Sequence, residues 1–137
     1  MADLIRTAQY FKMQIADTSG KLAHVLAPLH EAGVNLLAVH AFPRNRRTQV
    51  DLVPEVPTPF KNTAKLLKWN MQGPQTCFLV DGDDRPGALA DLTAQLASSR
   101  INITAVTGRS AGQGRFGAIL WVKPRDVKKA AKVFGIA

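Results

Sequence analysis

The most constraining feature of this chain is an internal duplication. Residues 16–39, ADTSGKLAHVLAPLHEAGVNLLAV, align without a gap with residues 83–106, DDRPGALADLTAQLASSRINITAV, at a spacing of 67 residues. The identical pairs are Asp17/Asp84, Gly20/Gly87, Leu22/Leu89, Ala23/Ala90, Ala27/Ala94, Leu29/Leu96, Asn35/Asn102, Ala38/Ala105 and Val39/Val106. Two copies of 67 residues nearly fill the 137-residue chain. The sequence therefore predicts two copies of one small module, with any site present in two related versions.

Hydrophobic periodicity gives both halves the same order of elements. Strands are expected at residues 9–16, 34–42, 48–53, 76–80, 101–106 and 116–122, and helices through 22–32, 60–67, 89–96 and 124–134. This order predicts an α+β fold of two ferredoxin-like βαββα(β) modules, with antiparallel sheets, helices on one face and a pseudo-two-fold relation. The expected boundaries are residues 1–70 for the first module, 71–74 for a linker and 75–137 for the second. Whether each module has a closing strand stays open, because little chain follows either second helix.

Composition restricts the compartment and the partners. No apolar run approaches the ~18 residues of a membrane span, and the first residues lack the pattern of a secretory signal. The single cysteine, Cys77, fits a reducing cytoplasm and excludes an internal disulfide framework. The net charge is +8, but several of the basic residues fall at helical spacing, which is typical of solvated helix faces.

The second half carries a turn and a strand start that resemble a known family. Residues 84–89 read Asp-Arg-Pro-Gly-Ala-Leu, and residues 101–103 read Ile-Asn-Ile; the first half has the degenerate versions Asp-Thr-Ser-Gly-Lys-Leu and Val-Asn-Leu. This pattern resembles the ACT domain, a family of small ligand-binding modules that typically sense amino acids and regulate metabolic enzymes or transcription factors. The resemblance covers nearly the whole chain and implies a tandem ACT protein without a catalytic domain.

The same residues have the chemistry that a free amino acid requires. Its carboxylate needs N–H donors, and a helix start offers unpaired ones with a favourable dipole. The expected donors are the amides of Gly87, Ala88 and Leu89, with those of Gly20, Lys21 and Leu22 in the other half. The ammonium needs acceptors, which Asn102 and Asn35 could supply, with added charge from Asp84 and Asp17. Helix capping and local turn bonding explain the Asp and Asn residues equally well without a ligand.

The predicted location of the site follows from the two apolar edge strands. Residues 34–42 and 101–107 would each lie at a sheet edge, where an exposed apolar strand is an aggregation hazard unless it is covered. Pairing of these edges would place ligands at the interface between the modules. We therefore expect two pseudo-symmetric pockets within the chain, or a homodimer that completes them.

Other chemistries find less support in the sequence. No nucleophile with a base can be argued, so an enzyme is not expected; His24 and His30 have poor metal-ligand spacing, and no metal or cofactor is expected. The main alternative is an RNA-binding ferredoxin-like protein, since residues 115–120 faintly echo an RNA-recognition strand. It would have to stack bases on Phe116 and Trp121, which fall on opposite faces of one strand. A docking module that has lost its ligand is the other alternative.

The sequence thus predicts a cytoplasmic regulatory protein that senses an amino-acid-like effector between its modules. The protein would transmit the binding of this effector to a protein partner, such as a metabolic enzyme or a regulator. Neither a membrane nor a nucleic acid is the expected partner.

Overall fold

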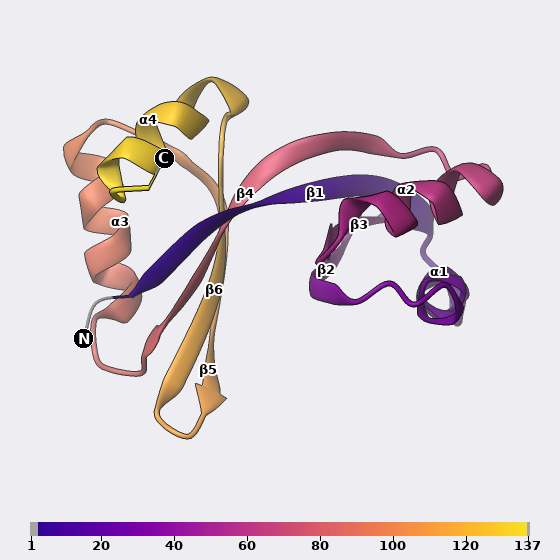
Figure 1. Ribbon diagram of the computed structural model, residues 1–137, viewed down its shortest axis with the longest axis horizontal. Coiled ribbons are helices and arrows are strands. Elements are labelled where there is room, and N and C mark those ends of the chain that lie inside the picture. The colour runs from indigo at the N-terminus through magenta and orange to yellow at the C-terminus, as the bar shows by residue number, and fades with distance from the viewer. Residues whose placement is uncertain (1–2, 137) are drawn as a thin grey trace. The chain divides into compact units, whose positions relative to one another are not determined.

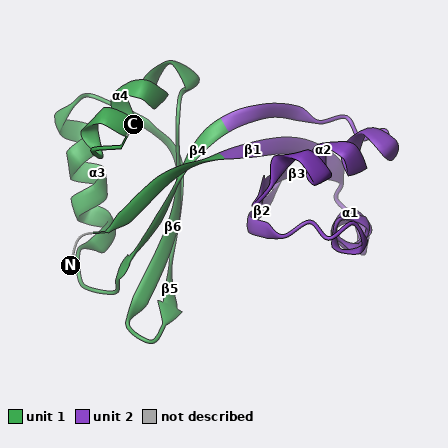
Figure 2. Cartoon of the chain, in the orientation of Figure 1, with its two compact units in different colours: residues 1–8, 76–137 green, residues 9–75 purple. Residues whose placement is uncertain are grey.

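The computed structural model describes residues 3–136, which divide into two compact units (Figures 1 and 2). Unit 2 consists of residues 9–75, and unit 1 consists of residues 3–8 together with residues 76–136. The elements are β1 (Leu4–Ala16), α1 (Lys21–Glu31), β2 (Leu36–Arg44), β3 (Arg47–Pro54), α2 (Pro57–Leu66), β4 (Gln72–Asp83), α3 (Ala88–Ser98), β5 (Ile103–Gly112), β6 (Arg115–Val122), the 3₁₀ turn η1 (Pro124–Asp126) and α4 (Val127–Val133). No helix within 3–136 has the length and apolar character needed to cross a membrane.

Unit 2 has the complete order β-α-β-β-α-β. Its strand order is β2-β3-β1-β4, where the last strand contributes residues 72–75, and β3 pairs antiparallel with both β1 and β2. The Tyr10 hydroxyl on β1 donates to Gln75 Oε1 on β4 at 2.8 Å. Both helices cover one face of this sheet, where Phe11 meets Phe60 of α2 with ring centroids 4.8 Å apart. The closing strand that the sequence left open is therefore present in this unit.

Unit 1 closes its sheet in a different way. Its strand order is β1-β4-β6-β5, and β6 pairs antiparallel with β4 and β5. Residues 134–136, which follow α4, form no strand. Residues 4–8 of β1 lie beside β4 instead, the place that β4 itself takes beside β1 in unit 2. Ile5 packs against both apolar clusters of this unit, the one around Phe78 and Leu96 and the one around Val80 and Leu92.

These units differ from the module boundaries expected at 1–70 and 75–137. Residues 3–8 belong to the same unit as residues 76–136, and residues 72–74 of the expected linker lie in β4. The physical reason is that unit 1 has an open strand position beside β4, which residues 4–8 fill while Ile5 becomes partly buried. Local pattern alone could not show this, since the position is created by residues far along the chain.

The helix-free face of the unit 2 sheet carries a buried polar group. Val50 and Leu52 of β3 point into the core, so the alternating residues Gln49 and Asp51 point to the other face, where they are only 8% and 7% exposed. Gln49 Nε2 donates to Asp51 Oδ1 at 3.0 Å. Burial raises the pKa of Asp51 above its ordinary value, against the lowering effects of the Gln49 hydrogen bond and of the charges of His40, Lys12 and Arg44.

Truncation of Ile5 tests the closure of unit 1. Ile5→Ala should lower the free energy of unfolding by about 1–2 kcal/mol, since a partly buried aliphatic side chain leaves two clusters. Leu4→Ala is the matched control, because Leu4 is 66% exposed and should change stability little. Urea unfolding followed by Trp121 fluorescence in a Trp69→Phe background reports unit 1. Equal losses for the two variants would contradict the assignment of residues 4–8.

A second test uses the buried carboxyl. Since the pKa of Asp51 is raised, the folded state binds its proton more tightly than the unfolded state, and stability is lost as pH rises from the ordinary value through the folded one. Asp51→Asn keeps an acceptor for Gln49 without the charge. The variant should gain stability relative to the wild type across that pH window and keep its advantage at pH 7. Urea midpoints measured at pH 3.5 to 7 check this, and a pH-independent difference would refute it.

Candidate functional site

The turn between β4 and α3 contains the Asp-Arg-Pro-Gly motif. Gly87 is the residue before α3 and has φ of +82°, a left-handed conformation that glycine adopts without a steric penalty. The corresponding Gly20 before α1 has φ of +86°, so the two halves build their helix starts in the same way. Among the described residues, no side-chain hydrogen bond caps the start of either helix. Both glycines thus expose the first turn of a helix, as the duplicated sequence predicts.

The first-turn N–H groups of α3 are only partly used. The Ala88 N–H donates to the Arg85 carbonyl at 3.3 Å, and the Asp91 N–H donates to the Gly87 carbonyl at 2.9 Å. Within residues 3–136, the N–H groups of Leu89 and Ala90 donate to no acceptor. Within the same residues, the Gly87 N–H also donates to no acceptor. Of the three N–H groups expected from the sequence, only that of Ala88 is therefore used, and those of Gly87 and Leu89, with that of Ala90 in addition, are available to a ligand.

Arg85 anchors this turn to two other segments. Its guanidinium lies 3.4 Å from Asp3 Oδ1 and 3.1 Å from Asp91 Oδ2, and it also donates to the Asp83 carbonyl at 3.3 Å. The hydrogen bond to Asp91 is the largest cause that raises the pKa of Arg85, with further contributions from Asp3. Arg85 is thus occupied in holding the turn, and it leaves the recognition of a ligand to other groups.

Asp84 connects the turn to the β5–β6 hairpin. Its Oδ2 accepts a hydrogen bond from the Ser110 hydroxyl at 2.9 Å, and its backbone N–H donates to the Gly114 carbonyl at 2.9 Å. Next to it, Asp83 Oδ1 pairs with Arg115 at 2.7 Å. The Asp84 side chain is exposed and keeps a second carboxylate oxygen, which can accept from a ligand.

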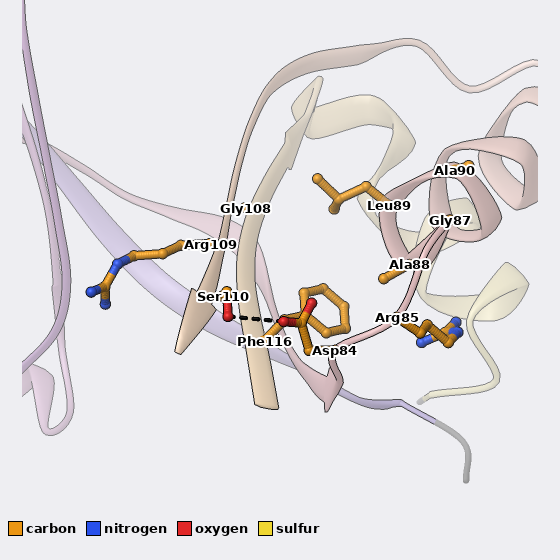
Figure 3. Close-up of a pocket in the computed structure, with 10 residues that line it drawn as sticks. All are labelled: Asp84, Arg85, Gly87, Ala88, Leu89, Ala90, Gly108, Arg109, Ser110 and Phe116. Carbon is orange, nitrogen blue, oxygen red and sulfur yellow. Dashed lines mark hydrogen bonds between the residues drawn. The ribbon is translucent and has the colours of Figure 1, made fainter. Parts of the chain in front are cut away.

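A cavity of about 330 Å³ lies between the start of α3 and the hairpin (Figure 3). Its lining consists of Asp84, Arg85, Gly87, Ala88, Leu89, Ala90, Gly108, Arg109, Ser110 and Phe116, all from unit 1. Leu89 extends from α3 toward β5, while Arg109 extends away from the helix. A Cβ on Gly108 would come within 2.6 Å of Leu89 Cδ1, so the absence of a side chain at this position lets Leu89 pack directly on β5. The volume is at the small end of the range for ligand pockets.

The cavity contains some of the residues predicted from the sequence and omits others. Asp84, Gly87, Ala88 and Leu89 line it, whereas Asn102 does not. In the first half, Asp17 Oδ1 accepts from the Thr48 hydroxyl at 3.1 Å and the Asn35 carbonyl accepts from the Glu55 N–H at 2.8 Å. Neither these two residues nor Gly20, Lys21 and Leu22 line the cavity at α3.

Sequence reasoning missed the β5 side of the site. It ended the strand at residue 106 and took residues 108–114 as a flexible turn, but β5 continues to Gly112. Gly108 and Ser110 therefore lie on a regular strand. The sequence contained one signal for the longer strand, the glycine at position 114, because two-residue hairpin turns favour glycine. In the structure, Gln113 and Gly114 form this turn between the paired residues 112 and 115, with φ of +56° and +73°.

The aromatic residues required by the RNA-binding alternative are not available. Phe116 is 5% exposed and Trp121 is 4% exposed, so neither can stack on a base without rearrangement of the core. In addition, no group of three or more His, Cys, Asp or Glu side chains suited to a metal ion occurs in the part of the chain that the structure describes.

Comparison with known proteins identifies solved structures that share the fold of this chain. No protein-family model and no curated protein matches the chain. A solved protein from Bacteroides thetaiotaomicron is similar at a TM-score of 0.83 and 16% identity, over 96% of this chain and 88% of its own. The ligand-free regulatory subunit of aspartate kinase from Thermus thermophilus is similar at a TM-score of 0.65 and 17% identity, over 97% of this chain and 94% of its own. The regulatory subunit of aspartate kinase from Thermus flavus is similar at a TM-score of 0.64 and 15% identity, over 98% of this chain and 95% of its own.

The chain has the ACT-domain fold. At these identities the likeness concerns the fold alone, and it confirms the resemblance that the Asp-Arg-Pro-Gly turn indicated. The ACT-domain fold also agrees with the expected α+β class, with its antiparallel strands and one-sided helices. A ligand-binding role for the cavity at α3 therefore depends on the residues of this chain and not on the likeness to these proteins.

Substitution of Gly87 tests the geometry of the turn. Gly87→Ala should lower the free energy of unfolding by about 1–2 kcal/mol, because the left-handed conformation is unfavourable for a residue with a Cβ. The added Cβ would meet no atom within 4 Å, so the cost is conformational. Gly87→Asn is the control and should cost less, because asparagine tolerates this conformation. Chemical denaturation of the two variants gives the comparison, and an unchanged Gly87→Ala would argue against the turn.

Proposed function

We propose that this protein is a non-catalytic regulator that binds an amino-acid-like effector in the cavity at the start of α3. One observation carries the proposal: the unused N–H groups of Leu89 and Ala90 lie at the same 330 Å³ cavity as the carboxylate of Asp84. A zwitterion needs donors for its carboxylate and an acceptor for its ammonium, and this cavity offers both. The ACT-domain fold and the regulatory subunits that share it support the proposal.

Each part of the ligand has a partner in this arrangement. The carboxylate would accept from the Leu89 and Ala90 N–H groups, where the helix dipole favours negative charge. The ammonium would donate to the free oxygen of Asp84, whose other oxygen is held by Ser110. The ligand side chain would lie against Leu89 and Phe116. The cavity of about 330 Å³, with Leu89 packed on Gly108, limits the size of this side chain, which favours a small effector.

Regulation would follow from the two elements that the ligand joins. Asp84 and the start of α3 lie on one side of the cavity, and Gly108 and Ser110 on β5 lie on the other. A ligand that contacts both sides stabilises the arrangement in which they are close, and the effect is limited by its affinity difference between the two arrangements. The exposed β5 then presents a different surface to a partner, for which an enzyme or a regulator in the cytoplasm is the proposed class.

The related residues of the first half are proposed as a second, unequal version of the site. Asp17, Gly20, Lys21, Leu22 and Asn35 keep the glycine start of α1, but Asp17 is bonded to Thr48 of β3 rather than to a residue on the edge strand. Asn102 remains part of the proposal, although it does not line the cavity at α3. A homodimer that completes the pockets also remains part of the proposal. The interface between modules is likewise still a prediction.

A ligand screen with matched variants tests the function. A thermal-shift screen against the twenty amino acids at millimolar concentration should raise the melting temperature selectively for one or a few. Calorimetry should then show that Asp84→Asn weakens binding of that amino acid about tenfold or more, because a charged hydrogen bond is lost. Gly108→Val should weaken it as well, because the added side chain would clash with Leu89 and displace it from its place in the cavity wall.

Asp17→Asn is the control for the assigned cavity. It removes the same charge at the equivalent position of unit 2, so the affinity at α3 should change little. If Asp84→Asn and Asp17→Asn bound the amino acid with wild-type affinity, the assigned cavity would be wrong. No shift with any amino acid would instead favour the docking-module alternative.

A further inference from the structure

Unit 2 contains a second cavity, unrelated to the duplicated turn. It has a volume of about 610 Å³ and is lined by nine residues from β1, the β2–β3 hairpin and residues 70–72. Three of them are the cations Lys12, Arg44 and Arg47, and none of the nine is acidic. Amide side chains such as Gln14, Asn45 and Asn70 add further donors. The cavity is thus a concave, hydrogen-bonding surface with a local excess of positive charge.

The β2–β3 hairpin places two of the cations directly opposite each other. Arg44 and Arg47 are cross-strand partners in the register, and Asn45 and Arg46 form the two-residue turn between them. Like charges directly opposite on neighbouring strands are destabilising. No acidic side chain forms an ion pair with either arginine within residues 3–136. An anion between the two guanidinium groups would relieve this repulsion.

Hydrogen bonds hold both arginines in place before any ligand arrives. Arg44 Nη1 donates to Gln49 Oε1 at 3.0 Å, and Gln49 Nε2 in turn donates to Asp51 Oδ1 at 3.0 Å. Arg47 Nη2 donates to the Gln14 carbonyl at 3.3 Å. Since Gln49 is only 8% exposed, the relay from Asp51 to Arg44 is anchored in the sheet. Guanidinium groups that are already oriented lose less side-chain entropy on binding.

The chemistry of the lining indicates the class of ligand. Planar guanidinium groups match the oxygens of a phosphate, and amides can bond the remaining oxygens or hydroxyl groups. No aromatic side chain occurs among the nine lining residues, so a nucleobase would find no stacking surface. We propose that this cavity is a binding site for a small phosphorylated compound, such as a sugar phosphate or a pyrophosphate, held between Arg44, Arg47 and Lys12.

Calorimetry with sodium pyrophosphate on the full chain tests the site. The wild type should bind pyrophosphate, and Arg44→Gln or Arg47→Gln should weaken binding about tenfold or more. Arg46→Gln is the matched control, because it removes the same charge from the same hairpin at a position outside the lining. It should weaken binding less than threefold. Gln49→Met keeps every charge but breaks the relay, and it should weaken pyrophosphate binding as well.

Two further readouts separate this site from a structural role and from the amino-acid site. In phosphate-free buffer Arg47→Gln should be at least as stable as the wild type, because the repulsion from Arg44 is removed. Asp84→Asn should leave pyrophosphate binding unchanged. The proposal is overturned if pyrophosphate does not bind, or if the three arginine variants lose affinity equally. Poly(U) RNA that competes more strongly per site than pyrophosphate would also overturn it, in favour of a nucleic acid.

Discussion

Closure of the unit 1 sheet by residues 4–8 is the constraint on which the candidate site depends. These residues fill the strand position beside β4, and Ile5 completes the two clusters that support α3. The segment just before them also reaches the site, because Asp3 pairs with Arg85 in the Asp-Arg-Pro-Gly turn. The Asp-Arg-Pro-Gly turn is thus tied to a residue 82 positions earlier in the sequence.

The parts of the site that follow from local chemistry could be predicted, and the parts set by distant contacts could not. The duplication and the glycine turn predicted both helix starts, and four of the five site residues expected in the second half line the cavity. Ser110 and Gly108 were missed because β5 is exposed along most of its length and so has no apolar alternation to extend it. Residues 4–8 were missed because their strand position exists only once unit 1 has folded.

The two units repeat one sequence pattern but differ in the side chains that line their cavities. In unit 1 the helix start faces an edge strand across a cavity with an acidic acceptor, whereas unit 2 gathers basic side chains at its hairpin. Gln49 links the buried Asp51 to Arg44 of this basic group. A duplicated module can therefore retain one backbone plan while its two copies gather side chains of different charge.

The division of β1 and β4 between the units also has a consequence for synthesis on the ribosome. Unit 2 is one continuous stretch, 9–75, whereas unit 1 needs residues from both sides of it. As the chain emerges in order, unit 2 has all its strands available first, while the hydrophobic Ile5 has no partner until β4 and the residues after it appear. Residues 4–8 are therefore synthesised before the whole of unit 2. The unit 1 sheet cannot close until unit 2 has emerged and the residues of β4 and beyond have followed it.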